Sequence, residues 1–433
     1  MNPSFNLIDH AWIPCISLEG DLIEVSLRDL LLRAPELREV ACATPIQSAA
    51  VLPLVLAILH RVFGPAKLAD WKALWDAHAF HMEAIDTYFA QWRERFDLFH
   101  RQWPFYQALD ERAKAKSLIH LVHTKGNTGT LFTHETDEEG MEASPAEAAR
   151  LLITSRFFHT CGAGPTIDGK KAYFKHSPYA SGVIFWAQGS NLFETLVLNL
   201  LLYAGERPMP KSDNDAPAWE MDEPFAQRSI PRGYLDYLTW SNNRIQLIPQ
   251  FNDGRLVVRE AIVAPAIEID WETVASPQKR NVYRKGRGAV TYSWLTFDPD
   301  KVLWRDYHSL LPQTTKVSPP AVVSWLHGLS QDRLLPGNYP LRLMATGMLA
   351  NGNAKVVFYR EEILPLPIQI LRDQDHRADI ADALKQAEDI GRALDRALNT
   401  LARHIRLRGA ASVERRGRFQ PPTAISRQSL TPG

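Results

Sequence analysis

Apolar and polar residues alternate over residues 5–16, and a second short alternating run covers residues 22–26. The turn Glu19-Gly20-Asp21 lies between the two runs, and glycine tolerates the positive φ of a tight turn. The pattern therefore predicts a β-hairpin at the start of the chain.

Helical spacing of apolar residues follows in several segments. Ser26 can cap a helix that ends at Leu32, and Thr44-Pro45 can open a helix that runs toward Val62. A third helix is predicted from Leu68 to Arg93. Further along, the Ser-Pro-Ala-Glu sequence at residues 144–147 is a capping box with proline at the first helical position, which predicts a helix to Phe158.

The second half of the chain combines strand patterns with one long helix. Residues 231–258 alternate as strands do, whereas residues 206–223 are rich in Pro and Asp and read as a linker. Two apolar runs between residues 341 and 363 surround Asn351-Gly352, a strong hairpin signal. Residues 379–408 carry an apolar stripe at helical spacing, and such a helix needs helical partners.

Length and charge limit the function classes. A chain of 433 residues exceeds one ordinary core, and 49 basic residues balance 49 acidic ones, so a nucleic-acid surface would have to be local. Three cysteines without CxxC spacing fit a reducing compartment. The N-terminus lacks a signal-peptide pattern, and apolar runs are shorter than the ~20 residues of a membrane-spanning helix. We expect a soluble, cytoplasmic protein with no membrane partner.

The segment from Phe157 to Tyr179 is the strongest candidate for a binding surface. It joins three glycines to lysines and aromatic rings, with Asp168 as the one acid. Glycine allows close backbone approach, and lysine and aromatic side chains suit phosphates and base faces. A glycine-rich surface turn with solvated lysines remains the alternative. Residues 279–287, KRNVYRKGR, are either a second basic patch or a solvated loop.

Familiar catalytic motifs do not occur. The chain contains no GxxxxGK[ST], HExxH, GxSxG or paired CxxC sequence. Residues 137–139 and the pair Glu361-Glu362 could bind a divalent ion, but a metal site needs carboxylates that converge from rigid elements. We assign no catalytic residue, no metal site and no cofactor. Two hypotheses stay open: a nucleic-acid-binding subunit of an assembly, and a metal-dependent nuclease or other enzyme without a familiar motif.

Several strings, in order and spacing, resemble one protein family. They cover about the first 370 residues and are Phe5-Asn6-Leu7-Ile8-Asp9, Trp12-Ile13-Pro14, Thr44-Pro45-Ile46-Gln47, Phe96-Asp97-Leu98-Phe99, Pro104-Phe105-Tyr106, Pro217-Ala218-Trp219-Glu220, residues 233–240 and the hairpin at 341–363. Together these strings are similar to the large subunit, CasA, of the type I-E CRISPR surveillance complex Cascade.

The resemblance implies a non-catalytic subunit. Such a subunit recognises the protospacer-adjacent motif in double-stranded DNA, destabilises the neighbouring base pairs so that guide RNA can pair, and docks the helicase-nuclease. Its implied partners are target DNA, the guide RNA complex, the other Cascade subunits (backbone, small and guide 5′-end subunits) and the helicase-nuclease.

The resemblance also implies roles for individual residues. Gly162, Ala163 and Gly164 match the family's glycine loop at the minor groove, and the tip Asn351, Gly352 and Asn353 matches its wedge, with Asn353 in the place of the wedge glutamine. The loop after Gly126 matches the loop that contacts the complex near the guide 5′ end, represented by Asn127, Thr128, Phe132 and His134. The family's minor-groove lysine has no clear counterpart, and the basic candidates for DNA contact are Lys170, Lys171, Lys279, Arg280 and Lys285.

The expected fold is α+β, with a large mixed α/β N-terminal domain and a reduced helical C-terminus. We predict residues 1–370 as the domain for motif recognition and docking, residues 371–408 as a helix, and residues 409–433 as a polar, disordered tail. The resemblance implies a C-terminal four-helix bundle, of which this sequence supplies one helix. The bundle is therefore expected to be incomplete, which puts its contacts with the small subunits and target DNA in doubt.

Overall fold

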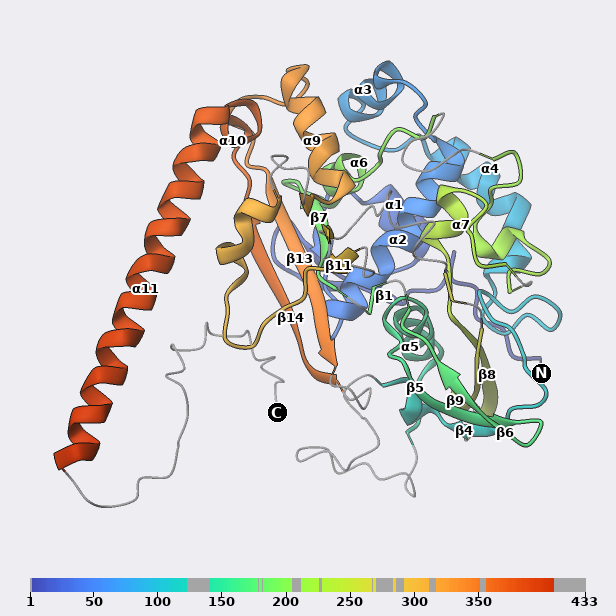
Figure 1. Cartoon of the computed structure of the whole chain (residues 1–433). Helices are drawn as coiled ribbons and strands as arrows, with labels where there is room; N and C mark the ends of the chain where they lie inside the picture. Colours follow the sequence, from blue (N-terminus) through green and yellow to red (C-terminus); the bar gives the residue numbers. More distant parts are fainter. Residues whose placement is uncertain are drawn as a thin grey trace.

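Helices and small antiparallel sheets are mixed along the whole chain, as Figure 1 shows, and the predicted α+β class is confirmed. The computed structural model describes residues 2–122, 141–177, 179–180, 182–204, 212–225, 228–266, 268–269, 283–285, 292–310, 317–350 and 356–408.

The predicted N-terminal hairpin is confirmed. Strand β1 (Ile13–Ser17) pairs antiparallel with β2 (Leu22–Val25) and also with β3 (Leu37–Val40). Gly20 has φ +100° in the connecting turn, a value that glycine adopts without steric cost. Helix α1 (Leu27–Leu32) begins as predicted, because the Ser26 hydroxyl accepts a hydrogen bond of 3.1 Å from the Asp29 amide.

Helix α2 (Pro45–Val62) forms the centre of the core. The Thr44 hydroxyl accepts from the Gln47 amide at 3.4 Å, which confirms the predicted start. Apolar residues cover all sides of α2, and most of them are buried. Among the described residues, α2 is the one helix long and apolar enough to cross a membrane, and 72% of its apolar window is buried inside the protein, as in any core helix.

The predicted helix over residues 68–93 is wrong as a single element. The chain instead forms α3 (Leu68–Asp76) and α4 (Met82–Trp92), followed by a 3-10 turn η1 (Arg93–Phe96). His78 has φ +54° at the break, and Phe80 is buried against the rings of Phe63 and Phe193, at centroid distances of 5.9 and 4.8 Å. Tertiary packing of one aromatic ring thus overrides the local helical pattern.

The described part of the segment predicted as a linker packs into the core. In its described portion, residues 212–223, Asp215 and Trp219 are buried, and the Asp215 carboxylate accepts hydrogen bonds of 2.9 Å from the amides of Leu235 and Asp236. This cap begins helix α7 (Tyr234–Leu238), where strand had been predicted. Strand structure starts later, at β8 (Asn243–Asn252), which pairs with β9 (Arg255–Pro265). The other edge of β9 pairs with β4 (Ala115–Ser117).

The predicted hairpin near residue 350 is confirmed. Strands β13 (Arg342–Ala350) and β14 (Val356–Pro365) pair antiparallel over nearly their whole length, and β7 (Ile184–Gln188) lies on the other side of β13. The tip lies outside the described residues. Remaining elements are η2 (Leu118–Leu121), α6 (Leu192–Leu198), η3 (Ala218–Glu220), β10 (Tyr283–Lys285), β11 (Tyr292–Trp294), η4 (Leu303–Leu310), β12 (Val317–Ser318), α9 (Ala321–Gln331) and α10 (Ile368–Arg372).

Helix α11 (Gln374–Arg408) stands off the body in Figure 1 and confirms the long predicted helix, with its start five residues earlier. The ion pair Arg305–Glu388 ties its first half to η4. Beyond that point the apolar stripe is exposed, with Ile390 at 69% and Ile405 at 62%. Residues 409–433 lie outside the described residues, and the division into domains stays a prediction.

A buried arginine joins four separate segments of the body. Arg156 lies in the last turn of α5 (Pro145–Phe158) and is fully buried. Its Nη2 donates to the Tyr106 carbonyl at 2.6 Å, and its Nη1 donates to the Asn243 Oδ1 at 2.8 Å and to the Ser241 hydroxyl at 3.1 Å. The guanidinium carbon lies 4.9 Å from the centroid of the Phe225 ring.

Carbonyl, amide and hydroxyl oxygens, rather than carboxylates, surround this guanidinium among the described residues. Burial lowers the pKa of Arg156 to about 9, so the group is still cationic at neutral pH. Its position at the C-terminal end of a helix also favours a cation, because the helix dipole is negative there.

We predict that Arg156→Met destabilises the protein by ~3 kcal/mol or more, because several buried oxygens lose their donor at once. Urea unfolding followed by tryptophan fluorescence measures this. The control Arg33→Met removes an exposed pair with Glu36 and should cost less than ~0.5 kcal/mol. Equal stability of the two variants would contradict the structural role of Arg156.

Candidate nucleic-acid interface

The glycine-rich segment is a two-stranded β-ribbon, rather than the surface turn or glycine loop considered from the sequence. Strand β5 (Gly162–Ile167) pairs antiparallel with β6 (Lys170–Phe174). Asp168 and Gly169 connect the strands with φ values of +50° and +74°, the pattern of a type I′ turn. The Asp-Gly pair between strand-forming residues is the signal that could have predicted this ribbon.

The ladder brings the predicted DNA-contact residues together. Ala163 lies opposite Tyr173, and Ile167 lies opposite Lys170, so the glycine segment and both lysines share one ribbon. Ala163 is exposed and Gly162 is half-buried, whereas Gly164 is buried. A Cβ atom on Gly164 would lie 3.2 Å from the Ala172 carbonyl oxygen and 3.2 Å from the Phe174 ring. Gly164 is therefore needed for packing within the ribbon.

The base of the ribbon is fixed to α5. The Ser177 amide donates to the His159 carbonyl at 2.8 Å, and the Tyr179 amide donates to the Phe157 carbonyl at 2.9 Å. The Tyr179 ring stacks on Phe157 at 5.4 Å. The segment before β5 and the segment after β6 are thus hydrogen-bonded to each other at the end of α5. The position of α5 therefore sets the position of the ribbon.

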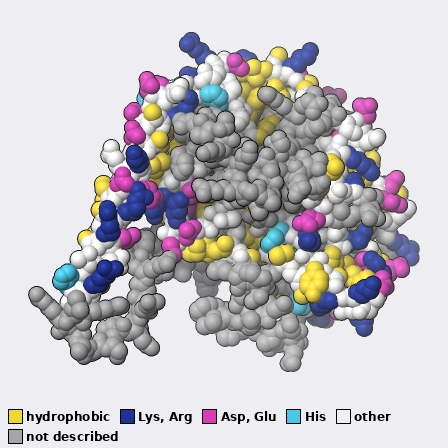
Figure 2. All heavy atoms as spheres, in the orientation of Figure 1, with side chains coloured by type: hydrophobic (Ala, Val, Ile, Leu, Met, Phe, Trp, Pro, Cys, Tyr) yellow, Lys and Arg dark blue, Asp and Glu magenta, His cyan; other side chains and the backbone are white. Residues whose placement is uncertain are grey.

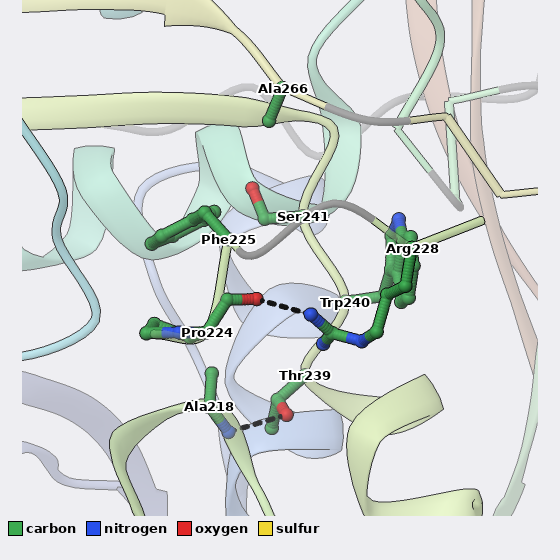
Figure 3. A pocket seen from close by; sticks show the side chains of 8 residues that line it. All are labelled: Ala218, Pro224, Phe225, Arg228, Thr239, Trp240, Ser241 and Ala266. Carbon is green, nitrogen blue, oxygen red and sulfur yellow. Dashed lines mark hydrogen bonds between the residues drawn. The ribbon is translucent and has the colours of Figure 1, made fainter. Parts of the chain in front are cut away.

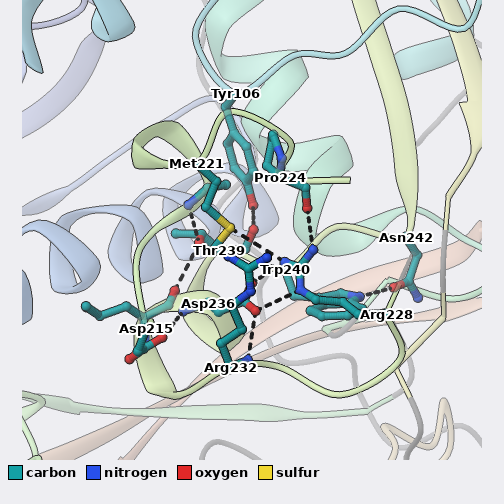
Figure 4. A network of polar contacts seen from close by, with 12 residues as sticks. Tyr106, Asp215, Met221, Pro224, Arg228, Arg232, Asp236, Thr239, Trp240 and Asn242 are labelled. Carbon is teal, nitrogen blue, oxygen red and sulfur yellow. Dashed lines mark hydrogen bonds and ion pairs between the residues drawn. The ribbon is translucent and has the colours of Figure 1, made fainter. Parts of the chain in front are cut away.

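A polar network around α7, drawn in Figure 4, is also connected to this base. Arg228 forms an ion pair of 2.6 Å with buried Asp236 and lies over the Trp240 ring at 4.8 Å. The Trp240 ring nitrogen donates to Asn242 at 2.8 Å, and the Asn242 amide donates to the His176 carbonyl. The network thus connects the α7 region with the last residues of the ribbon.

His176 adds a contact inside the base. Its Nδ1 accepts a hydrogen bond of 3.3 Å from the Cys161 amide, which requires an unprotonated nitrogen. Burial lowers the pKa of His176, although the nearby Glu268 carboxylate acts in the opposite direction. The neutral ring fits its role as an acceptor.

The local charges leave the two predicted lysines available. Asp168 pairs with Arg112 at 3.3 Å, and Glu268 pairs with Lys175 at 3.3 Å. Lys170 and Lys171 are exposed and form no ion pair with any residue that the structure describes. Figure 2 shows dark blue, yellow and some magenta side chains together at the lower right, where Figure 1 places β4, β5 and β6.

Most of the other predicted site residues belong to segments that the structure does not describe. Asn127, Thr128, Phe132, His134, Lys279, Arg280, Asn351, Gly352 and Asn353 lie outside the described residues. Lys285 lies in β10, opposite Tyr292 of β11. These residues stay predictions, whereas the strands that carry the 351–353 tip are well defined.

The acidic pair considered as a metal site has a structural role in part. Glu362 accepts a hydrogen bond of 3.0 Å from the Leu303 amide and lies 3.2 Å from Arg360. Its neighbour Glu361 lies across from Thr346 in the β13–β14 ladder. Within the described ranges, no group of three or more His, Cys, Asp or Glu side chains could hold a metal ion.

The described surface also has a small cavity and an open groove. One is a cavity of about 10 Å³ beside Phe225, Arg228 and Trp240, shown in Figure 3, with space for about one water molecule. The other is an open groove of about 690 Å³ along α4 and the end of α2. Arg61 and Tyr88 in that groove already bind Glu220, at 3.0 and 2.8 Å. Neither hollow joins a nucleophile to a base.

Comparison with known proteins gives consistent matches. The family of CRISPR-associated protein Cse1 matches residues 6–426, beyond the part in which we noted the resemblance. The CRISPR-associated protein CasA/Cse1 of Thermus thermophilus is 31% identical over 418 residues, which cover 93% of this chain and 78% of that protein.

Solved structures share the fold. Cse1 from Acidimicrobium ferrooxidans superposes with a TM-score of 0.79 at 29% identity, over 91% of this chain and 77% of that one. A chain of a CRISPR RNA-guided surveillance complex has the same fold, with a TM-score of 0.77 at 23% identity, over 92% of this chain and 83% of that one.

We predict that Gly164→Val destabilises the ribbon by ~1–3 kcal/mol, because the new side chain must displace the Ala172 carbonyl or the Phe174 ring. Hydrogen exchange of the β5–β6 amides should accelerate. The matched control is Ala163→Val on the same strand, where the side chain is exposed and valine favours the strand. Similar exchange in both variants would contradict the packing assigned to Gly164.

Proposed function

Because the chain belongs to the CRISPR-associated Cse1 (CasA) family, the large subunit of the type I-E Cascade surveillance complex, we propose that it reads the protospacer-adjacent motif in double-stranded DNA. The observation that carries this proposal is the β5–β6 ribbon, in which Ala163 is exposed opposite β6 and Lys170 and Lys171 have no acidic partner among the described residues.

Electrostatics favour a contact that depends on the assembly. The chain has no net charge, so few phosphates are neutralised by this subunit. Binding by the isolated chain should therefore be weak, with a shallow dependence on salt. Inside a complex that also holds the DNA elsewhere, each further contact forms at a high effective concentration. Motif recognition should therefore be measurable mainly in the assembled complex.

Strand separation is assigned to the β13–β14 hairpin. Nine residues of β13 pair with β14, and β13 is also held by β7, so the tip is carried by a stiff support. A polar tip on such a support can open a base step while an amide such as that of Asn353 bonds to a base edge. Base pairing of the guide RNA then reads the rest of the target.

The subunit itself acts without catalysis in this proposal. Cleavage is left to the helicase-nuclease, which the large subunit helps to recruit in the cytoplasm. The alternative of a metal-dependent nuclease is favoured by no observation, since the described carboxylates do not converge on a metal site.

The direct test is a titration of the complex, assembled from this chain, the other subunits and guide RNA, against duplexes that differ only in the flanking motif. The proposal expects motif-dependent binding in the assembly and weak binding by the chain alone. Binding that ignores the motif in every combination, or cleavage by the chain alone, would refute the proposal.

We predict that Asn353→Ala slows opening of target DNA about tenfold, because a lost base-edge contact is worth ~1–3 kcal/mol, and leaves Cascade assembly intact. A fluorescent base analogue beside the motif reports opening, and size-exclusion chromatography reports assembly. The control Asn252→Ala changes the same residue type in the β8–β9 hairpin. Unchanged opening rates in Asn353→Ala would remove Asn353 from the wedge.

We predict that Gly162→Asp weakens binding of motif-bearing duplex at least tenfold, because it adds a negative charge to the strand that is proposed to approach phosphates. Gly328→Asp is the control, since its Cβ atom meets open space on α9 and the charge change is identical. A filter-binding titration of the assembled complex compares the two. Wild-type affinity in Gly162→Asp would refute the role of this strand.

A further inference from the structure

Tyr173 is the most exposed large aromatic residue on the described ribbon, with 63% of its surface accessible to solvent. Alternation along β6 explains why. The Phe174 ring faces inward, over Gly164 and against the His159 ring at 4.5 Å, so the residue before it must face outward. Solvation of a tyrosine ring in this way costs free energy unless another molecule covers it.

The neighbours of Tyr173 leave most of its side chain exposed. Ala163 is its partner across the ladder, and a methyl group there covers little of the ring. Lys171 lies two residues before Tyr173 on the same outward face and has no ion pair within the described residues. Lys175, two residues after it, is held by Glu268.

We propose that Tyr173 stacks on an unpaired base of single-stranded nucleic acid, while Lys171 and Lys170 bind the adjacent phosphates. Bases inside a duplex stack on one another, so a tyrosine ring has access to a base face only where a strand is unpaired. An exposed ring between cationic side chains is the arrangement that single-strand-binding proteins use. The chemistry shared by possible ligands is a flexible strand with free base faces.

The proposed function identifies the strand, and this step rests on that proposal. Opening of the target duplex releases a displaced DNA strand, and the β5–β6 ribbon and the outer end of β13–β14 both lie at the lower side of the molecule in Figure 1. Exposed Lys114, just before β4, and exposed Lys116, within it, continue the basic surface. The Arg112–Asp168 pair ties the segment before β4 to the ribbon turn. We therefore assign the site to displaced DNA.

The test uses the full chain and fluorescein-labelled oligo-dT of 15 nucleotides, with fluorescence anisotropy at low salt. Tyr173→Ala should raise Kd about fivefold or more, whereas Tyr173→Phe should retain wild-type affinity because it keeps the ring. The control Phe251→Ala removes another ring, 50% exposed, that has no neighbouring lysine in β8 and should have no effect. Equal Kd values for wild type and Tyr173→Ala would overturn the site.

Two further arms decide between mechanisms and ligands. Lys171→Gln should lower the slope of log K against log salt by about 0.7, while Tyr173→Ala should leave the slope unchanged. Oligo-rU of the same length tests the alternative source, guide RNA, and tighter binding of rU than of dT would overturn the assignment to displaced DNA. Because oligo-dT carries no motif, failure here leaves motif recognition standing, and motif-independent duplex binding leaves this site standing.

Discussion

The buried guanidinium of Arg156 is the interaction on which the functional face depends. It sits at the end of α5 and donates to oxygens from the Tyr106 segment and from the start of β8, so that three parts of the chain far apart in sequence share one donor. Without a carboxylate among its described neighbours, the cation is held by several oriented dipoles, and removal of the arginine would take a donor from each of them.

The oxygens that surround Arg156, here called the Arg156 cage, determine the position of the ribbon. Two residues after Arg156, α5 ends, and β5 starts four residues later. The Asn242–His176 hydrogen bond brings the segment between α7 and β8 against the residues that follow β6, so both strands are joined at the base of the ribbon to the segments that surround Arg156. A binding surface on two short strands is useful only if its support is rigid, and the cage supplies that support.

Local pairing of charges explains how a chain without net charge can present a cationic face. At the ribbon, Asp168 is paired with Arg112, and Glu268 is paired with Lys175. Lys170 and Lys171 are left without such partners in the described structure. Other carboxylates are likewise held in contacts within the protein, such as Glu362, which accepts a hydrogen bond from the Leu303 amide. Recognition of a polyanion by this subunit therefore relies on a small, oriented set of cations rather than on overall charge.

Local chemistry predicted those elements whose ends are decided by neighbouring residues. Ser26, Thr44 and Ser144 cap their helices as their sequences indicate, and the long spacing of apolar residues gave α11. Elements decided by distant residues could not be predicted this way. The break at Phe80 depends on ring packing, and α7 depends on the Asp215 carboxylate from a segment that reads as a linker.

The candidate site shows the same division. The glycines and lysines were identified from composition, because residue type alone suggests phosphate contact. Their arrangement as a ribbon was missed although Asp168-Gly169 encodes its turn, and the outward position of Tyr173 depends on the register with Ala163. Arg156 gave no signal, because a buried arginine cannot be told from a surface arginine without its neighbours.

The central claim is that the β5–β6 ribbon meets motif-bearing DNA in the assembled complex. Hydrogen exchange of the amides of residues 162–174, measured in the guide-loaded complex with duplexes that carry or lack the motif, tests it most directly. We expect these amides to exchange more slowly when the duplex carries the motif, and not when the duplex lacks it. Identical exchange with both duplexes, at concentrations where the motif-bearing DNA is bound, would contradict it.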